Sequence, residues 1–147
     1  MSVTKRAVPI VGGILSGVTI VFTTDSISGA LYPIPPDIDP DNKEQVIEYL
    51  EKMPASAFVL MLAGYVAASF IAGIVATALA KRYSRIDSPT PVRPAFTAGL
   101  LLTVANIVNA IGFPHPFWFI VCNTILHVPA ALIGYYLARR KPVGDIY

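Results

Sequence analysis

The stretch that decides the fold lies between Gly64 and Ala80 and reads GYVAASFIAGIVATALA. Small residues recur every four positions along it, a spacing that places them on one face of an α-helix. A first row consists of Gly64, Ala68, Ala72, Ala76 and Ala80, and a second row beside it consists of Ser69, Gly73 and Thr77. Because small side chains let a neighbouring backbone approach closely, the stretch predicts a helix that packs tightly against other helices.

Four apolar spans are found when the chain is followed outward from this stretch. The stretch belongs to a span of residues 55–80, and the others cover residues 7–32, 95–113 and 117–137. Hydrophobic residues make up 54% of the 147-residue chain and charged residues only 14%, a composition typical of an integral membrane protein. The sequence therefore predicts an all-α, polytopic membrane protein with a single domain, residues 1–147, that contains four transmembrane helices.

The first span carries a packing motif of its own. Gly13 and Gly17 form a pair of small residues four apart, so we expect this face to lie against the span of residues 55–80. Two basic residues before an apolar run also fit a secretory signal peptide. The apolar run extends as far as Tyr32, which favours an uncleaved transmembrane helix.

Residues 33–54 predict an acidic outer loop and a short amphipathic helix at the membrane surface. Asp41 stands three residues before Glu44, the spacing of an N-terminal capping box. The polar side of the helix is acidic, so attraction to anionic lipid does not explain its position. Its apolar side carries Val46, Ile47, Leu50 and Met53.

The basic residues predict the orientation in the membrane, because cytoplasmic loops are enriched in Lys and Arg. Only Lys43 and Lys52 lie between the first two spans. The other nine lie on the opposite side: Lys5, Arg6, Lys81, Arg82, Arg85, Arg93, Arg139, Arg140 and Lys141. We therefore expect a multi-pass protein of a bacterial inner membrane with both termini in the cytoplasm. The net charge of +2 is too small to suggest nucleic acid as a partner.

Polar side chains inside three of the spans predict a layer at similar depth. At a rise of about 1.5 Å per residue, Asp25 and Asn106 lie about 10 Å, and Asn123 about 9 Å, below the outer ends of their helices. Asn109 lies one turn nearer the outer surface than Asn106, and His127 lies one turn deeper than Asn123. These five residues form the candidate binding site.

The layer has two interpretations. In the functional one, Asp25 is the charged member, His127 is a proton acceptor, and the asparagines are hydrogen-bonding ligands. In the structural one, the side chains hydrogen-bond helix to helix, at an average of about 0.6 kcal/mol per pair in membranes. His127 also has a local alternative, because Pro129 leaves the carbonyl of residue 125 without its helical donor.

Motifs for catalysis, a cofactor or a metal are absent from the sequence. The one cysteine, Cys122, excludes a disulfide within the chain and a cysteine-rich metal site. The chain has no glycine-rich phosphate loop, no His-Glu-x-x-His and no Gly-x-Ser-x-Gly. His115 lies in a turn that lacks further metal ligands. We therefore predict no catalytic residue, no cofactor and no metal.

Proline-rich motifs follow the first span and flank the later ones. An acid and a glycine precede Tyr32-Pro33-Ile34-Pro35-Pro36, and Asp39-Pro40, a short amphipathic helix and Met53-Pro54 come next. Pro114-His115-Pro116-Phe117-Trp118-Phe119 lies before the last span. Together these motifs resemble a group of small four-span bacterial membrane proteins over nearly the whole chain. The resemblance implies the four-span fold, and the group supplies no established activity.

Three functions are compatible with these observations. The favoured hypothesis is a structural or accessory membrane protein that docks a partner protein, a second copy of itself or lipid. The alternative is a small transporter or channel component that couples protons or cations through Asp25 and His127. The third hypothesis is a lipid-handling enzyme with a site reached from the outer leaflet. A water-lined pocket that reaches the polar layer would count against a purely structural role.

Overall fold

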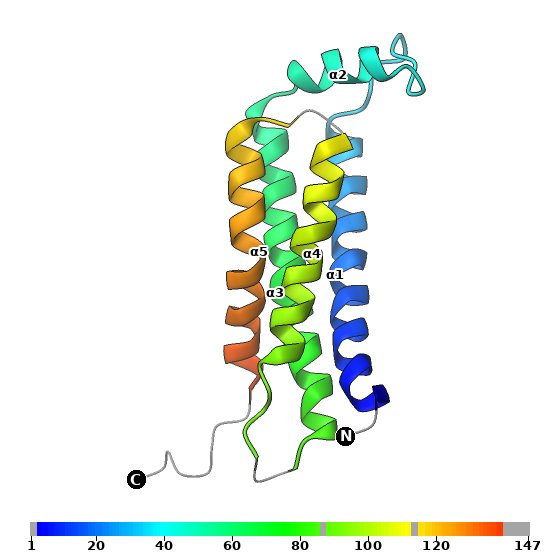
Figure 1. Cartoon of the computed structure of the whole chain (residues 1–147). Helices are drawn as coiled ribbons and strands as arrows, with labels where there is room; N and C mark the ends of the chain where they lie inside the picture. The colour runs from blue at the N-terminus through cyan, green and yellow to red at the C-terminus, as the bar shows by residue number, and fades with distance from the viewer. Residues whose placement is uncertain (1–2, 86–87, 113–114, 140–147) are drawn as a thin grey trace.

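Five helices make up the described part of the chain, which covers residues 3–85, 88–112 and 115–139 of a computed structural model. They are α1 (Val3–Leu31), α2 (Lys43–Glu51), α3 (Ala55–Tyr83), α4 (Arg93–Gly112) and α5 (Phe117–Ala138). No strand occurs in the described ranges, so the predicted all-α class is confirmed. The four long helices run side by side, and the short α2 lies across one end of them (Figure 1).

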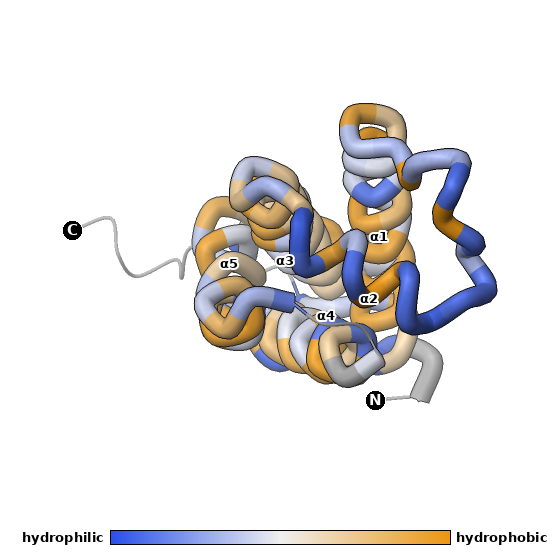
Figure 2. Tube along the Cα trace, turned by 90° about the horizontal axis from the view of Figure 1, so that it is seen from above, coloured by the Kyte–Doolittle hydropathy of each residue, from blue (hydrophilic) through white to orange (hydrophobic). Residues whose placement is uncertain are grey.

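α3 contacts all of the other long helices. It packs against α1, α4 and α5, and α4 in turn packs against α1 and α5. Within the described residues α1 and α5 do not contact each other, and the view from above places them on different sides of α3 and α4 (Figure 2). α3 therefore needs more than one packing face, and its two rows of small residues provide them.

The first row of small residues in α3 faces α1. A Cβ atom added at Gly13 would lie 2.8 Å from the backbone oxygen of Ala72, and one added at Gly17 would lie 3.3 Å from the backbone oxygen of Ala68. Ordinary contacts of a Cβ atom lie at 3.4–4 Å. The backbone of α1 thus approaches α3 more closely than a side chain at these two positions permits.

The second row faces α5. Gly73 lies directly against the backbone of Ala131, and Gly134 of α5 lies against the backbone carbonyl of Phe70. Gly99 of α4 also approaches α5, because a Cβ atom there would lie 2.8 Å from the Ala131 Cβ. Backbone atoms cannot swing away as the end of a long side chain can, so these glycines set the separation of α5 from its two neighbours.

α2 starts one residue later than its sequence motif predicted. Asn42, and not Asp41, is the N-cap: its side-chain oxygen accepts hydrogen bonds from the backbone N–H groups of Glu44 (3.1 Å) and Gln45 (3.3 Å). The N–H of Asp41 donates instead to the carboxylate of Asp39 at 3.0 Å. The predicted cap is wrong because the preceding turn uses Asp39 as its side-chain acceptor.

A tyrosine links α2 to the end of α1. The Tyr49 hydroxyl lies 2.9 Å from the carbonyl oxygen of Tyr32 and 3.3 Å from that of Pro33.

On the exposed side of α2, Lys52 donates to Glu48 at 2.6 Å. This hydrogen bond and the opposite charges lower the pKa of Glu48 and raise the pKa of Lys52. Such exposed pairs contribute little to stability.

Three helices are long and apolar enough to cross a membrane: α1 from Lys5 onward, α3 and α5. In the described part of the chain α4 is not among them. Within the described residues, length and composition therefore qualify three helices, rather than the predicted four, as candidate membrane spans.

The outer surface of the long helices is apolar. Soluble monomers rarely expose contiguous apolar patches larger than a few hundred Å². Here large apolar side chains point outward on all four long helices, among them Leu15 (62% exposed), Phe22 (70%), Val59 (54%), Val108 (65%) and Leu137 (71%). This surface, together with the three apolar helices, suggests a membrane environment.

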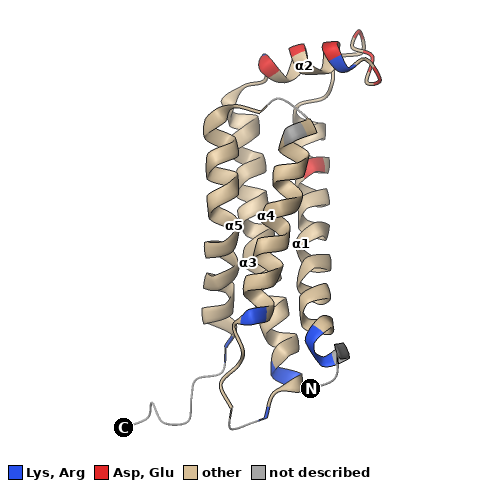
Figure 3. Ribbon diagram, viewed as in Figure 1, with Lys and Arg blue, Asp and Glu red and all other residues tan. Residues whose placement is uncertain are grey.

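Charged residues gather at the two ends of the long helices (Figure 3). Acidic side chains lie on α2 and the loop before it. Basic side chains lie near the starts of α1 and α4 and near the ends of α3 and α5. Asp25 is the only acidic residue within the four long helices.

The close contact of Gly73 in α3 with the Ala131 backbone of α5 can be tested with a matched pair of variants. Gly73→Ala should lower the melting temperature in detergent by several degrees, because the new Cβ overlaps the Ala131 backbone and overpacking costs about 1–3 kcal/mol. Gly29→Ala in α1 is the control, since nothing lies within 4 Å of its added Cβ. Alanine stabilises a helix by about 0.5–1 kcal/mol relative to glycine, so this variant should not be destabilised. Thermal unfolding followed by circular dichroism measures both. Equal melting temperatures for the two variants would contradict the close α3–α5 packing.

Candidate functional site

Four polar side chains from three helices form a buried chain of hydrogen bonds. The Ser69 hydroxyl of α3 lies 2.5 Å from Nδ1 of His127 in α5, and Nε2 of His127 lies 3.0 Å from Oδ1 of Asn123. Nδ2 of Asn123 donates to Oδ1 of Asn106 in α4 at 3.3 Å. The chain ends within α4, where Nδ2 of Asn106 donates to the carbonyl oxygen of Leu102 at 3.0 Å.

The hydrogen bonds of this chain all run in one direction. The amide oxygen of Asn123 can only accept, so Nε2 of His127 carries the proton and Nδ1 accepts from the Ser69 hydroxyl. An uncharged imidazole therefore satisfies both neighbours. Among the described residues, no buried side-chain nitrogen or oxygen lacks a hydrogen-bond partner. A fully satisfied buried network of this kind fixes how α3, α4 and α5 sit against one another.

The close approach of α3 and α5 brings Ser69 and His127 together. Gly73 lies one turn beyond Ser69 on α3, and Ala131 lies one turn beyond His127 on α5. Residues four apart share a helix face, and Gly73 packs directly against the Ala131 backbone. The hydrogen bond and the glycine contact are therefore neighbouring parts of one seam. A larger side chain at Gly73 would push the helices apart and lengthen the Ser69–His127 contact.

The order Ser69–His127–Asn123 is similar to the nucleophile, base and orienting residue of a hydrolase. A substrate would have to reach the hydroxyl, but Ser69 is 0% exposed and His127 is 1% exposed. One cavity in the described part of the chain lies beside α1 and α4, and another lies beside α2. None of the four network residues lines either of them. In this packing the arrangement links helices and does not present a nucleophile.

Asp25 does not join the buried chain. Its side chain is exposed on α1, and its Oδ1 accepts a hydrogen bond from the Tyr65 hydroxyl of α3 at 2.8 Å. The neighbouring Thr24 is the buried residue of this turn, and it packs against Gly64. The structure therefore brings Asn106, Asn123 and His127 together but leaves Asp25 outside the group.

Two further expectations for the polar layer differ from the structure. Asn109 lies one turn from Asn106, but its side chain is exposed and takes no part in the buried chain. His127 does not turn to the carbonyl of residue 125, because its two ring nitrogens face Ser69 and Asn123.

The sequence did not predict that Tyr65 and Ser69 are hydrogen-bond partners of Asp25 and His127. Ser69 belongs to a row of small residues, so its pattern indicates packing alone. For Asp25, the angular position of the residue around the helix axis could have been estimated from the sequence. At about 100° per residue, Thr24 falls on the same face as Gly13 and Gly17, whereas Asp25 is rotated about 100° away from Thr24. The glycine motif therefore indicates that Asp25 lies beside the packing face of α1.

The described residues were compared with the requirements of a metal site, and the chain with known proteins. The described residues contain no group of three or more His, Cys, Asp or Glu side chains that could hold a metal ion. His115 stacks on Phe119 with ring centroids 5.1 Å apart, and Cys122 is a half-buried thiol. No known protein family, curated protein or solved structure matches the chain.

Two asparagines on α4 test the buried chain. Asn106→Leu should lower the melting temperature in detergent by several degrees, because it leaves the buried Asn123 amide without its acceptor, at a cost of about 1–3 kcal/mol. Asn109→Leu makes the same chemical change at an exposed position one turn away and should leave the melting temperature nearly unchanged. The measurement is thermal unfolding of both variants beside the unaltered protein. If Asn109→Leu destabilised as much as Asn106→Leu, the buried chain would not be a specific link.

Proposed function

We propose that the chain is an integral membrane protein in which all four long helices cross the bilayer as one bundle, and that its role is structural or accessory. The observation that carries this proposal is the distribution of polar and apolar side chains. Polar groups such as Ser69, Asn123 and His127 are buried and hydrogen-bonded, while large apolar side chains cover the outside. A lipid bilayer favours this distribution, because unpaired polar groups are costly in hydrocarbon.

α4 fits this proposal although it is not among the three candidate spans. Thr103 and Asn106 are buried, and each hydrogen-bonds a carbonyl oxygen one turn earlier in α4 itself. The outward face of α4 is apolar and carries Leu100, Leu101, Val104, Ile107 and Val108. With Thr103 and Asn106 buried, this face offers lipid a mainly apolar surface, on which Asn109 is an exposed polar residue.

The closed interior favours a structural or accessory role over transport. A proton or cation pathway needs titratable or polar groups that line an aqueous space. Asp25 is separated from the buried chain and pairs with Tyr65, and neither the cavity beside α1 and α4 nor that beside α2 is lined by Asp25 or His127. The apolar outer faces remain available to a partner protein, a second copy of the chain or lipid.

The separation of charge supports an orientation in a bacterial inner membrane. Basic residues gather at the end where α1 begins and α5 ends, and acidic residues gather around α2 at the other end (Figure 3). By the rule that cytoplasmic segments are rich in Lys and Arg, the basic end faces the cytoplasm and α2 lies on the outer surface.

Cysteine labelling tests whether α4 crosses the membrane. In a Cys122→Ser background, Asp37→Cys and Phe117→Cys should react with a membrane-impermeant maleimide in intact cells, because both residues are exposed at the outer end. Arg82→Cys, exposed at the end of α3, should react only after the cells are opened. The readout is the mass shift of the labelled chain. Labelling of Phe117→Cys from the same side as Arg82→Cys would contradict four crossings.

A flux assay separates the structural role from transport. Protein reconstituted into vesicles that contain a pH-sensitive dye should give the same proton leak as protein-free vesicles, with a proton ionophore as the positive control. Asp25→Asn should leave that leak unchanged. A leak above background that Asp25→Asn abolishes would contradict the structural role and establish a transport function.

A further inference from the structure

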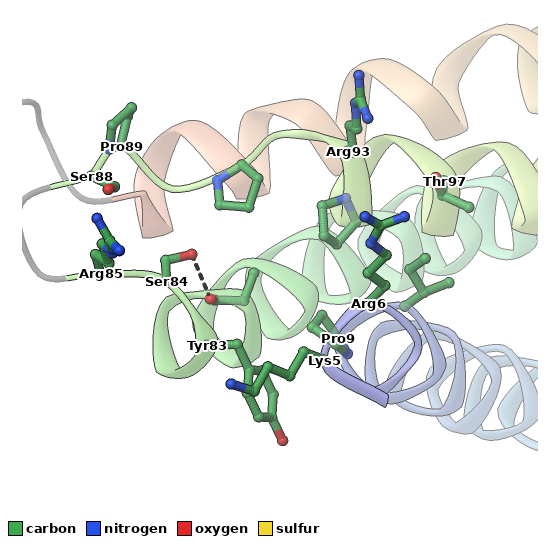
Figure 4. Close-up of a pocket in the computed structure, with 14 residues that line it drawn as sticks. Lys5, Arg6, Pro9, Tyr83, Ser84, Arg85, Ser88, Pro89, Arg93 and Thr97 are labelled. Atoms are coloured by element: carbon green, nitrogen blue, oxygen red, sulfur yellow. Dashed lines mark hydrogen bonds between the residues drawn. The ribbon is translucent and has the colours of Figure 1, made fainter. Parts of the chain in front are cut away.

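A cavity of about 830 Å³ opens at the basic end of the long helices (Figure 4). Lys5, Arg6 and Pro9 of α1 line one side of it, and Tyr83 closes it from the end of α3. The start of α4 and the segment before it complete the wall. The cavity therefore lies where three helices and one connection meet, and it is remote from the buried hydrogen-bond chain.

The rim of the cavity is cationic. Lys5 and Arg6 come from α1 and Arg93 from the first residue of α4, and all three side chains are exposed. Arg85 of the connection also lines the cavity. Its lining in the described part of the chain includes no Asp or Glu. Several basic side chains around one cavity attract an anion, and guanidinium groups bind phosphate oxygens through paired hydrogen bonds.

The inner wall is apolar. Pro9, Ala80 and Pro94 are buried, and Ile10 and Pro91 lie beside them. A volume of this size falls within the range of sites for organic ligands and far exceeds what a single phosphate ion fills. An inorganic anion would leave the apolar wall unoccupied. An amphiphile with a phosphate head and a hydrocarbon chain matches both parts of the lining.

The geometry points to a binding site for the phosphate headgroup of an anionic phospholipid. The inference rests on the proposed membrane-spanning arrangement, which places this end of the helices at the level of the cytoplasmic headgroups. Basic pockets between helices on that side of a membrane are a general means of binding anionic lipid. The phosphate meets the basic side chains of the rim, and the start of the acyl chain lies along Ile10 and the prolines.

The test compares two double variants with the same loss of charge. Lys5→Gln/Arg6→Gln removes one Lys and one Arg from the rim. Lys81→Gln/Arg82→Gln removes one of each from the last turn of α3, outside the lining. The purified full-length chain is titrated in mild detergent with phosphatidylglycerol, with phosphatidylcholine of the same acyl chains, or with inorganic phosphate. Melting temperature and native mass spectrometry report binding, and circular dichroism without lipid checks that each variant is folded.

We expect phosphatidylglycerol to raise the melting temperature of the unaltered chain by several degrees and to remain bound in the mass spectrometer, whereas phosphatidylcholine does neither. At about 1 kcal/mol for each basic residue near an anionic lipid, the rim variant should bind phosphatidylglycerol roughly 30-fold more weakly. The control variant should bind it like the unaltered chain. If the rim double variant does not fold, Arg93→Gln replaces it, with Arg82→Gln as its control.

Three results would overturn the inference. Equal loss of binding in the rim and control variants would mean nonspecific attraction to the basic end. Equal stabilisation by the two lipids would mean that the headgroup charge is not recognised. Full stabilisation by inorganic phosphate, with no further gain from the lipid, would identify a free anion as the ligand. If the lipid test fails but Phe117→Cys is labelled from outside the cell, the proposed membrane role is retained and only the lipid site is rejected. The two proposals can therefore fail separately.

Discussion

The close approach of α3 to the backbones of α1 and α5 is the constraint on which the rest of the structure depends. Gly13 and Gly17 bring α1 against one face of α3, and Gly73 meets the Ala131 backbone on another. The second contact sets the distance between α3 and α5 one turn away from Ser69 and His127. The hydrogen-bond chain that continues into α4 therefore depends on a glycine that takes no part in it.

The same packing buries several polar side chains and leaves many large apolar ones on the surface. Once the small faces of α3 are occupied, Asn106 of α4 and Asn123 and His127 of α5 lie inside and hydrogen-bond to one another. A neutral imidazole satisfies its two neighbours, so the hydrogen bonds of the interior require no charged group. This is the reason for proposing a structural role for the buried polar residues rather than a transport pathway.

The two ends of the molecule differ in both charge and construction. At one end α2 lies across the helices with an exposed acidic surface. At the other end, α1, α3 and α4 leave an open cavity under a basic rim. In the proposed membrane arrangement, this difference gives the molecule a direction, and the basic cavity lies at the level of the cytoplasmic headgroups.

The sequence by itself determined the helices, since apolar runs and proline-rich breaks depend only on local chemistry. It also determined, through glycines spaced four apart, which faces could pack. Depth along a helix could be estimated from residue count, and on that basis Asp25 and Asn106 were expected in one layer. Only the tertiary structure decided how each helix is turned about its axis. Packing of Gly13 and Gly17 buries Thr24 and turns Asp25 toward Tyr65, and the glycine seam of α3 and α5 selects Ser69, a residue with no polar signature of its own, as the partner of His127.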